Sequence, residues 1–246
     1  MREPIYAIGD IHGQVEELKR VLALIAADGG PDAKIIFLGD YTDRGPESRA
    51  VIELLIEGQA SARNWTFLKG NHDRMFCWFM QDPPRREDYL PVELSWLHPR
   101  LGGDRTLASY GADFTQRTKL KKVHRRALAA VPQEHLAFLQ ELPLSFQTEE
   151  VFFVHAGIRP GVALKDQTEH DLLWIRQEFH LDPRMHPKLI VHGHTPVDQP
   201  THYGNRINLD CGAGYGRPLA AAVFEGSACW HLTEHGRVAL RPRQST

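Results

Sequence analysis

The sequence lacks the features that mark membrane, fibrous and disulfide-stabilised proteins. Its longest apolar runs are only a handful of residues, far short of the ~20 needed to cross a bilayer. The three cysteines, Cys77, Cys211 and Cys229, are an odd number at scattered spacings, which argues against a disulfide framework and against a cysteine-type zinc site. The N-terminal segment also lacks the cationic start and the cleavage site of a secretory signal. We therefore expect a cytoplasmic globular protein.

Neither sign of charge is in excess. The 29 Lys and Arg residues and 31 Asp and Glu residues give a net charge of −2, so we expect neither a nucleic acid nor a membrane as partner. The chain has 246 residues, 42% of them hydrophobic, which suffices for a sizeable core. We expect a single domain over residues 1–246. The unusual number is the 14 histidines, several of which lie beside glycines.

One pattern occurs three times within residues 1–70. An apolar run of strand length ends in glycine and a polar residue, and the runs cover residues 5–8, 34–38 and 65–69. Apolar residues recur at helical spacing between these runs. The alternation predicts a parallel β-α-β-α-β unit. Its three polar loops then meet at the carboxyl edge of the sheet, where open α/β sheets place their sites.

The middle of the chain, about residues 82–145, indicates a helical insert. Prolines and a Gly102-Gly103 pair interrupt regular structure, and two helices are predicted over 119–131 and 133–142. Six Lys or Arg residues fall within 117–126, beside apolar residues at helical spacing. This pattern is typical of a solvated basic face. An anchor for an anionic substrate is the less favoured interpretation.

The last third of the chain returns to short apolar runs. Strands are predicted over 151–154, 188–191, 206–209, 219–224 and 228–232, and a turn at residues 225–227 makes the last two a hairpin. The chain is therefore parallel α/β first and more antiparallel later. We expect an α/β fold of two packed sheets with helices outside.

Five loops follow predicted strands and carry side chains of the kinds that bind metals: Gly9–Gly13, Gly39–Gly45, Gly70–Asp73, Val154–Gly157 and His192–Thr195. Each alone would more often be a turn, a helix cap or a structural histidine. Together they supply carboxylate, imidazole and amide oxygen donors, which suit Mn²⁺, Fe or Zn²⁺ better than a calcium cage or a thiolate site. One ion needs fewer donors than this, so the sequence predicts two metals that share a bridging carboxylate.

The ordered motifs GDIHG, GDYTDRG, GNHD, HAG and HGHT resemble those of the metallophosphoesterase superfamily. Within it, the chain is similar to the PPP-type serine/threonine protein phosphatases of bacteria and phages, from Asp10 to the 210–219 segment. The resemblance implies a calcineurin-like β-sandwich of two mixed sheets flanked by helices. It also implies a metal-dependent phosphoprotein phosphatase with two divalent ions, with Mn²⁺ preferred and Fe or Zn²⁺ as alternatives.

The resemblance also implies roles for single residues. The metal ligands would be Asp10 and His12 for the first ion, Asp40 as the bridge, and Asn71, His155 and His194 for the second. Arg44 and Arg176 would bind the substrate phosphate. His72, paired with Asp43, would protonate the leaving group after in-line attack by a hydroxide held between the metals.

Three further residues belong to the same motifs. Asp73 stands where eukaryotic members usually carry glutamate. His192 is either a support for the ligand two residues on or a buried histidine at a strand end. The resemblance also makes Tyr215 a neighbour of the metals.

Other activities remain open beside hydrolysis of a phosphoprotein or phosphopeptide. Symmetrical diadenosine tetraphosphatases share the GNHD and HAG forms, which makes a dinucleoside polyphosphate the alternative substrate. That group typically has alanine in place of Asp43. A phosphodiesterase usually ends in a GHxH motif, whereas Pro196 and Val197 follow here. An inactive metal-binding scaffold would usually have lost ligands, and none is missing.

Overall fold

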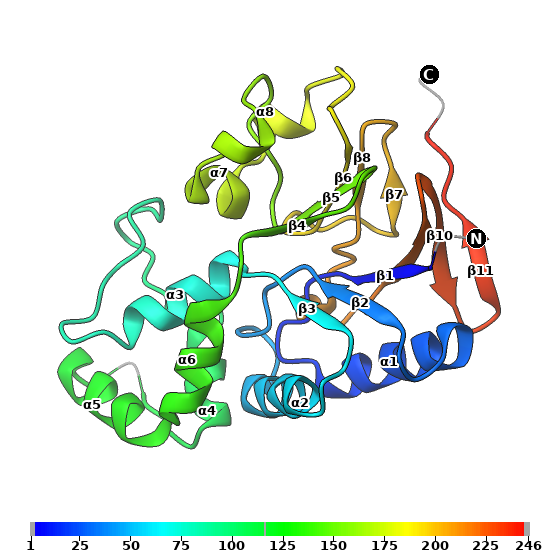
Figure 1. Ribbon diagram of the computed structural model, residues 1–246. Coiled ribbons are helices and arrows are strands. Elements are labelled where there is room, and N and C mark those ends of the chain that lie inside the picture. Colours follow the sequence, from blue (N-terminus) through cyan, green and yellow to red (C-terminus); the bar gives the residue numbers. More distant parts are fainter. Residues whose placement is uncertain (1–2, 116, 244–246) are drawn as a thin grey trace.

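The computed structural model describes residues 3–115 and 117–243, and it places two β-sheets between outer layers of helices (Figure 1). The first sheet has the order β11-β10-β9-β1-β2-β3. Its strands are β1 (Ile5–Ile8), β2 (Lys34–Phe37), β3 (Trp65–Phe67), β9 (Ala221–Glu225), β10 (Ala228–Thr233) and β11 (Gly236–Ala239). β1, β2 and β3 are parallel to one another, and β9 to β11 continue the sheet in antiparallel order. The β-α-β-α-β prediction is confirmed.

The second sheet has the order β4-β5-β6-β8-β7. Its strands are β4 (Ser145–Gln147), β5 (Val151–Val154), β6 (Leu189–His192), β7 (Thr201–His202) and β8 (Arg206–Asn208). β5, β6 and β8 are parallel, and the two edge strands are antiparallel. Both sheets are therefore mixed, as expected.

The side chains of each strand alternate between two cores because successive residues of a strand point to opposite faces. Tyr6 and Ile8 of β1 pack toward helices, while Ala7 packs toward the other sheet. Phe153 of β5 also enters the space between the sheets, where its ring lies 5.5 Å from that of Phe224 on β9. Phe152 points outward instead. The alternation explains how two buried sheets arise from runs that are apolar on both faces.

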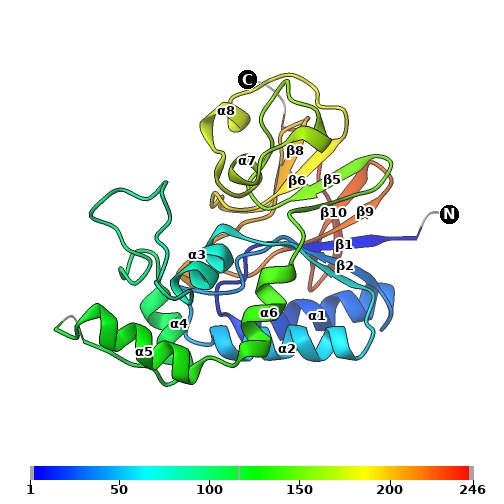
Figure 2. The ribbon, with the colours of Figure 1, turned by 60° about the vertical axis from the view of Figure 1, so that its left-hand side comes forward.

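Helices cover the outer faces of both sheets. α1 (Val15–Gly29) and α2 (Ser48–Ala60) lie against the first sheet, as Figures 1 and 2 show. α7 (Glu169–Trp174) and α8 (Gln177–His180) cover the second sheet, where Leu172 and Phe179 pack on Phe152. Two single-turn 3₁₀ helices cover Leu164–Asp166 and Ala213–Tyr215. None of the helices in the described ranges combines the length and the apolarity needed to span a membrane.

The helical insert packs against the edge of the first sheet at β3. Its helices are α4 (Gly103–Ser109), α5 (Leu120–Ala130) and α6 (Gln133–Glu141), and α3 (Asn71–Phe79) leads into it from the third loop. The ring of Phe138 on α6 lies 5.3 Å from that of Phe67 on β3, and Phe76 of α3 stacks on Trp96. α5 and α6 match the predicted helices to within two residues. Gly102-Gly103, expected to be a loop, instead begins α4, because Gly102 adopts a left-handed conformation before the helix.

The sequence patterns did not identify the short edge strands β4, β7 and β11 or the helices α3, α7 and α8. The edge strands have at most four residues each, too few for a periodicity. Each pairs with a strand that is its neighbour in the chain, β4 with β5, β7 with β8 and β11 with β10. The predicted strands at 188–191 and 219–224 lie one to two residues away from β6 and β9.

Truncation of Phe153 tests the packing between the sheets. Phe153 is fully buried, so Phe153→Ala is expected to lower the free energy of unfolding by about 3–5 kcal/mol. The measurement is urea unfolding of the metal-free protein. Val92→Ala, at a side chain that is 89% exposed, serves as the control and should change stability by less than about 0.5 kcal/mol. A loss of the same small size at Phe153 would contradict this account of the core.

Candidate metal centre

The five predicted loops meet at one edge of the structure because each follows a strand that points the same way. Asp10 and His12 follow β1, Asp40 follows β2, Asn71 begins α3 after β3, His155 follows β5 and His194 follows β6. All six side chains are buried. The two sheets touch here, since a methyl group on Gly9 would lie 2.3 Å from the carbonyl oxygen of Leu209. The site therefore draws its residues from both sheets.

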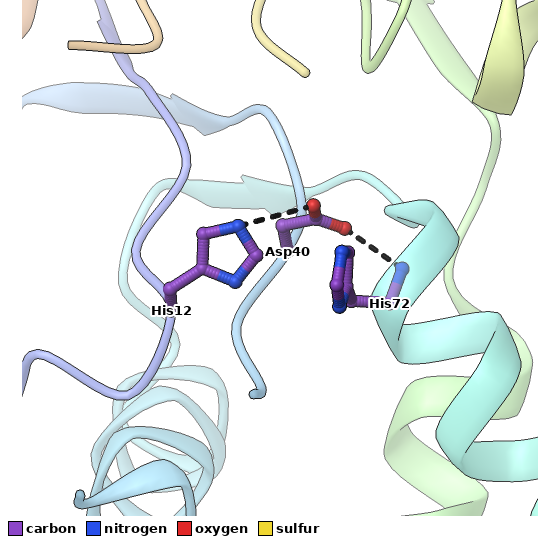
Figure 3. Close-up of side chains that lie close together, drawn as sticks. All are labelled: His12, Asp40 and His72. Atoms are coloured by element: carbon purple, nitrogen blue, oxygen red, sulfur yellow. Dashed lines mark hydrogen bonds and ion pairs between the residues drawn. The ribbon is translucent and has the colours of Figure 1, made fainter. Parts of the chain in front are cut away.

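Asp40 lies at the centre of the cluster. Its Oδ2 is 3.4 Å from Nε2 of His12, and its Oδ1 is 3.5 Å from Nε2 of His155. Its Oδ1 also accepts the backbone N–H of His72 at 3.0 Å, and Figure 3 shows His12 and His72 on either side of the carboxylate. Two groups could each hold a metal ion, namely His12, Asp40 and His72, and Asp40, His155 and His194. Asp40 belongs to both groups.

Two histidines are oriented by backbone carbonyls behind them. Nδ1 of His12 donates to the carbonyl of Thr42 at 2.8 Å, and Nδ1 of His155 donates to the carbonyl of Leu38 at 2.9 Å. Each donation selects the tautomer whose Nε2 carries a lone pair toward Asp40. Burial lowers the pKa of both rings, that of His155 to about 4. Both imidazoles are therefore neutral at pH 7, as metal ligands must be.

Asn71 and Asp10 complete the cluster. The side-chain oxygen of Asn71 lies 2.8 Å from both Nε2 of His155 and Nδ1 of His194. Asp10 accepts the backbone N–H of His194 at 3.0 Å. Nε2 of His194 and Oδ2 of Asp210 are buried and have no hydrogen-bond partner among the described residues. Unsatisfied polar atoms of this kind are rare in protein interiors, and here they lie among nitrogen and oxygen donors.

The cluster concentrates negative charge away from water. Burial, together with the charges of Asp210 and Asp40, raises the pKa of Asp10 well above its usual range. Burial likewise raises the pKa of Asp40 to about 7. Divalent cations offset repulsion of this kind and favour the ionised carboxylates. The donor set and its excess negative charge therefore fit divalent metals of the first transition series.

The loops hold strained backbone. His12, Asp40, Asp43, Arg44 and His194 all have positive φ values between 48° and 73°, and Ala62 is the other non-glycine residue with this conformation in the described ranges. Such conformations are unfavourable for residues with a Cβ, and they occur where contacts with surrounding residues hold the backbone in place.

The Asp73 carboxylate makes contacts of this kind. It accepts the backbone N–H groups of Asp40, Tyr41 and Gly70, each at 2.9 Å. Asp73 thereby links the second loop to the third. The sequence predicted no such role for it.

Glycine is required where the backbone passes the carboxylates. A methyl group at Gly193 would lie 1.9 Å from Oδ1 of Asp10, and one at Gly70 would lie 2.1 Å from Oδ1 of Asp40. Neither carboxylate could keep its place beside an alanine. The glycines of the GNHD and HGHT motifs therefore leave the space that the carboxylates of Asp40 and Asp10 occupy.

Comparison with known proteins agrees with this geometry. The family model described as calcineurin-like phosphoesterase matches residues 3–223. The chain belongs to the calcineurin-like phosphoesterase family. It is 26% identical over 240 residues to the asymmetrical bis(5'-nucleosyl)-tetraphosphatase PrpE of Bacillus thuringiensis (strain Al Hakam), covering 88% of this chain and 89% of that protein. The PrpE protein of Oceanobacillus iheyensis is also 26% identical, with 88% and 87% covered.

Solved structures share the fold. A putative diadenosine tetraphosphatase superposes with a TM-score of 0.65 at 20% identity, covering 93% of this chain and 92% of that one. A cold-active protein-tyrosine phosphatase of a Shewanella species superposes with a TM-score of 0.60 at 15% identity, covering 98% and 81%. At these identities the likeness establishes the fold of this phosphoesterase and leaves its substrate open.

His72 belongs to the first of the two possible metal groups and is also the centre of a further set of contacts in this phosphoesterase. Nδ1 of His72 lies 2.6 Å from Oδ2 of Asp43. Arg44 donates to Nε2 of His12 and, at 3.0 Å, to Nε2 of His72. The ring of Tyr215 lies 4.9 Å from the Arg44 guanidinium, and its side chain is 61% exposed. The structure thus brings the predicted pair of His72 and Asp43 together, with Arg44 beside it.

Arg176 and His192 take different places. Arg176 is exposed, and its pKa is lowered by partial loss of solvent and by the charge of Arg44, so it lies near the site. His192 is a buried histidine at the end of β6, where Nε2 accepts from Arg206 at 3.1 Å and the ring contacts Phe179. Both interpretations of His192 fit the structure, because its Nδ1 also lies 3.0 Å from the carbonyl oxygen of Gly193, directly before His194.

Sequence reasoning missed the residues that hold Asp43. Nε1 of Trp96 donates to Oδ2 of Asp43 at 2.8 Å, and Oγ1 of Thr106 donates to its Oδ1 at 2.6 Å. Both come from the insert, which contains no motif that would have found them. Asp210, buried beside Asp10, also received no role from the sequence.

Asp40→Asn tests the shared carboxylate. Mn²⁺ added to the chelator-treated wild type is expected to raise the Tm, because a ligand that binds only the native state stabilises it, and the variant should lose most of this shift. Scanning calorimetry and metal analysis measure both effects. Asp32→Asn, at an exposed carboxylate, should keep the full shift. A full Tm shift and full metal content in Asp40→Asn would contradict the assignment of Asp40 as a metal ligand.

The same variant gives a pH test without metal. The folded pKa of Asp40, about 7, lies above the ordinary 3.8, so the ionised carboxylate destabilises the metal-free native state. Its protonated form relieves that cost at low pH, and the relief is lost as pH rises toward 7. Metal-free Asp40→Asn is therefore expected to be more stable than the wild type at pH 8. The difference in Tm should shrink as pH falls from 7 to 4. A difference independent of pH would contradict the shifted pKa.

Proposed function

We propose that this phosphoesterase hydrolyses phosphate monoesters of serine and threonine side chains in proteins. The observation that carries the proposal is the buried pair of His72 and Asp43, with Nδ1 and Oδ2 2.6 Å apart. An alcohol is a poor leaving group, so its oxygen must receive a proton as the ester bond breaks. A carboxylate behind the imidazole fixes the tautomer and stabilises the protonated ring.

The proposed metal ligands are those around Asp40. Asp10 and His12 would hold the first ion, Asp40 would bridge, and Asn71, His155 and His194 would hold the second. Two bound divalent ions supply a nucleophile at neutral pH and neutralise charge on the phosphoryl oxygens. We propose Mn²⁺ as the native metal, with Fe or Zn²⁺ as alternatives that the same donors suit.

Two arginines are proposed to bind the substrate phosphate. Arg44 already directs its guanidinium at Nε2 of His12 and of His72, so a phosphate bound to it would lie beside the proton donor. Arg176, exposed at the rim, would approach from the second sheet. A planar guanidinium pairs with two phosphate oxygens at once, which an ammonium group cannot do.

The charge of Arg44 also links substrate binding to proton donation. Burial and then Arg44 lower the pKa of His72 below its usual value. A phosphate dianion on Arg44 offsets that positive charge, and the pKa of His72 rises. The imidazole would then take up a proton as the substrate binds. Trp96 and Thr106 keep Asp43 fixed on its far side throughout.

Hydrolysis of a dinucleoside tetraphosphate is the second candidate. It is favoured by the PrpE relatives, whose names state a bis(5'-nucleosyl)-tetraphosphatase of the asymmetrical kind. Cleavage of a tetraphosphate expels a phosphate chain, which leaves without full protonation. Such a reaction does not require the His72–Asp43 pair, nor the hydrogen bonds by which Trp96 and Thr106 hold Asp43.

Turnover of a substrate panel by the Mn²⁺-loaded protein decides between the candidates. The panel contains phosphoserine, phosphothreonine and phosphotyrosine peptides, diadenosine tetraphosphate and p-nitrophenyl phosphate. The highest kcat/KM is expected for a phosphoserine or phosphothreonine peptide. A much higher value for diadenosine tetraphosphate would move the function to the second candidate. Absence of turnover of every substrate would make the protein a metal-binding scaffold.

Asp43→Asn tests the role of the pair. The variant keeps the size of the side chain but loses the carboxylate, so kcat for a phosphoserine peptide is expected to fall by roughly 10²–10⁴, the scale for loss of general acid catalysis. The loss on p-nitrophenyl phosphate should be much smaller, because nitrophenolate leaves without a proton. Metal content should be unchanged. Equal small losses on both substrates would show that Asp43 does not assist proton transfer.

A further inference from the structure

The exposed surface of α5 carries positive charge that the described chain does not neutralise. This α5 basic surface consists of Arg117, Lys119, Lys121, Lys122, Arg125 and Arg126, all exposed. Within residues 3–115 and 117–243 none of the six forms an ion pair with a carboxylate, although Arg126 donates to the backbone carbonyl of Asp113. α5 contains no acidic residue. In a chain of net charge −2, such a surface indicates an anionic partner.

Three of the cations lie at the N-terminal end of α5, where the helix dipole repels them. Lys119 is the N-cap of α5, and Lys121 and Lys122 lie in its first turn. The helix dipole places positive partial charge there, so acidic or hydroxyl side chains are favoured and cations are not. No side chain caps the free N–H groups. The arrangement opposes helix stability and favours a bound anion.

A cavity opens along one side of α5. Its volume is about 450 Å³, within the range of ligand pockets, and it is lined by Lys119, Lys121, Lys122, His124, Arg125 and Leu128, together with Asp82. The lysines supply flexible N–H donors, which bind phosphate as point charges. Cations therefore outnumber anions in the lining.

His124 gives an independent indication of a ligand. Its side chain lines the cavity but is only 7% exposed, and its ring packs edge-on against Phe79 of α3 at 5.4 Å. Its Nε2 is buried and has no hydrogen-bond partner in the described part of the chain. A buried imidazole nitrogen without a partner is costly. His124 thus lines the cavity without a hydrogen-bond partner of its own in the described part of the chain.

We propose that this cavity binds a phosphoryl group on a polypeptide substrate, at a residue other than the one that is hydrolysed. α3 begins at Asn71 in the metal centre and ends at Phe79 against His124. Its nine residues rise about 13 Å, a span that about four residues of extended peptide cover. A substrate that contacts both sites therefore needs at least about four residues between them. The polypeptide part of this inference rests on the proposed function.

The test compares two peptides that share one cleavable phosphoserine. One carries a non-hydrolysable phosphonate mimic of phosphoserine four to six residues away, and the other carries alanine there. With the Mn²⁺-loaded wild type, the KM is expected to be at least fivefold lower for the phosphonate peptide, with kcat unchanged. In Lys121→Glu/Lys122→Glu the ratio of KM values should fall below two. Turnover of p-nitrophenyl phosphate should not change.

Lys165→Glu/Arg241→Glu is the matched control. It changes the net charge by the same amount at exposed residues outside the α5 basic surface, and it should keep the fivefold preference. His124→Leu should weaken the preference, and His124→Gln, which retains an N–H donor, should restore part of it. Equal KM values for the two peptides in the wild type, or an unchanged preference in the α5 variant, would overturn the proposal.

Binding without turnover separates this inference from the proposed function. Fluorescence anisotropy of the labelled phosphonate peptide should show affinity that is lost in Lys121→Glu/Lys122→Glu, whether or not the peptide is cleaved. If that binding occurs and no phosphopeptide is hydrolysed, the second site stands and the proposed phosphatase activity fails. If inorganic phosphate at the same concentration displaces the α5-dependent fraction as well as the peptide itself does, the site belongs to free phosphate and the polypeptide assignment is overturned.

Discussion

The burial of three neighbouring carboxylates is the constraint on which the rest of the site depends. Asp10, Asp40 and Asp210 lie together away from water, and burial raises the pKa of each above its ordinary value. Backbone N–H groups from the loops of both sheets offset part of this cost, as those of His194 and His72 do. Divalent cations offset the remainder. The metal-free fold is therefore under electrostatic strain that metal binding relieves.

That constraint explains why the architecture has two sheets. Asp40 and Asn71 come from the first sheet and His155 and His194 from the second, so the packing between the sheets sets the spacing of the ligands. The inner core, with Phe153 against Phe224, fixes this spacing. Asp73 then locks two of the loops together through backbone N–H groups. A change that disturbs the packing between the sheets is therefore expected to change the geometry of the site as well.

The helical insert supplies what the metal-binding loops lack. Trp96 and Thr106 hold Asp43, which contacts His72, so the proposed proton donation depends on a segment without recognisable motifs. The insert also carries the α5 basic surface and its cavity, at the far end of the helix that begins at Asn71. Metal binding belongs to the sandwich. The residues that hold Asp43 and the proposed second contact with substrate belong to the insert.

The sequence by itself determined the parallel strands, the order of the five loops and the residue types at the site, because apolar periodicity and local motifs are properties of short segments. It also predicted α5 and α6. Only the tertiary structure decided that Asp73 binds the second loop, that His192 faces Arg206, and that Trp96 and Thr106 support Asp43. Those contacts join residues up to 63 positions apart. Such pairings depend on how sheets and helices pack, and no periodicity within a segment encodes them.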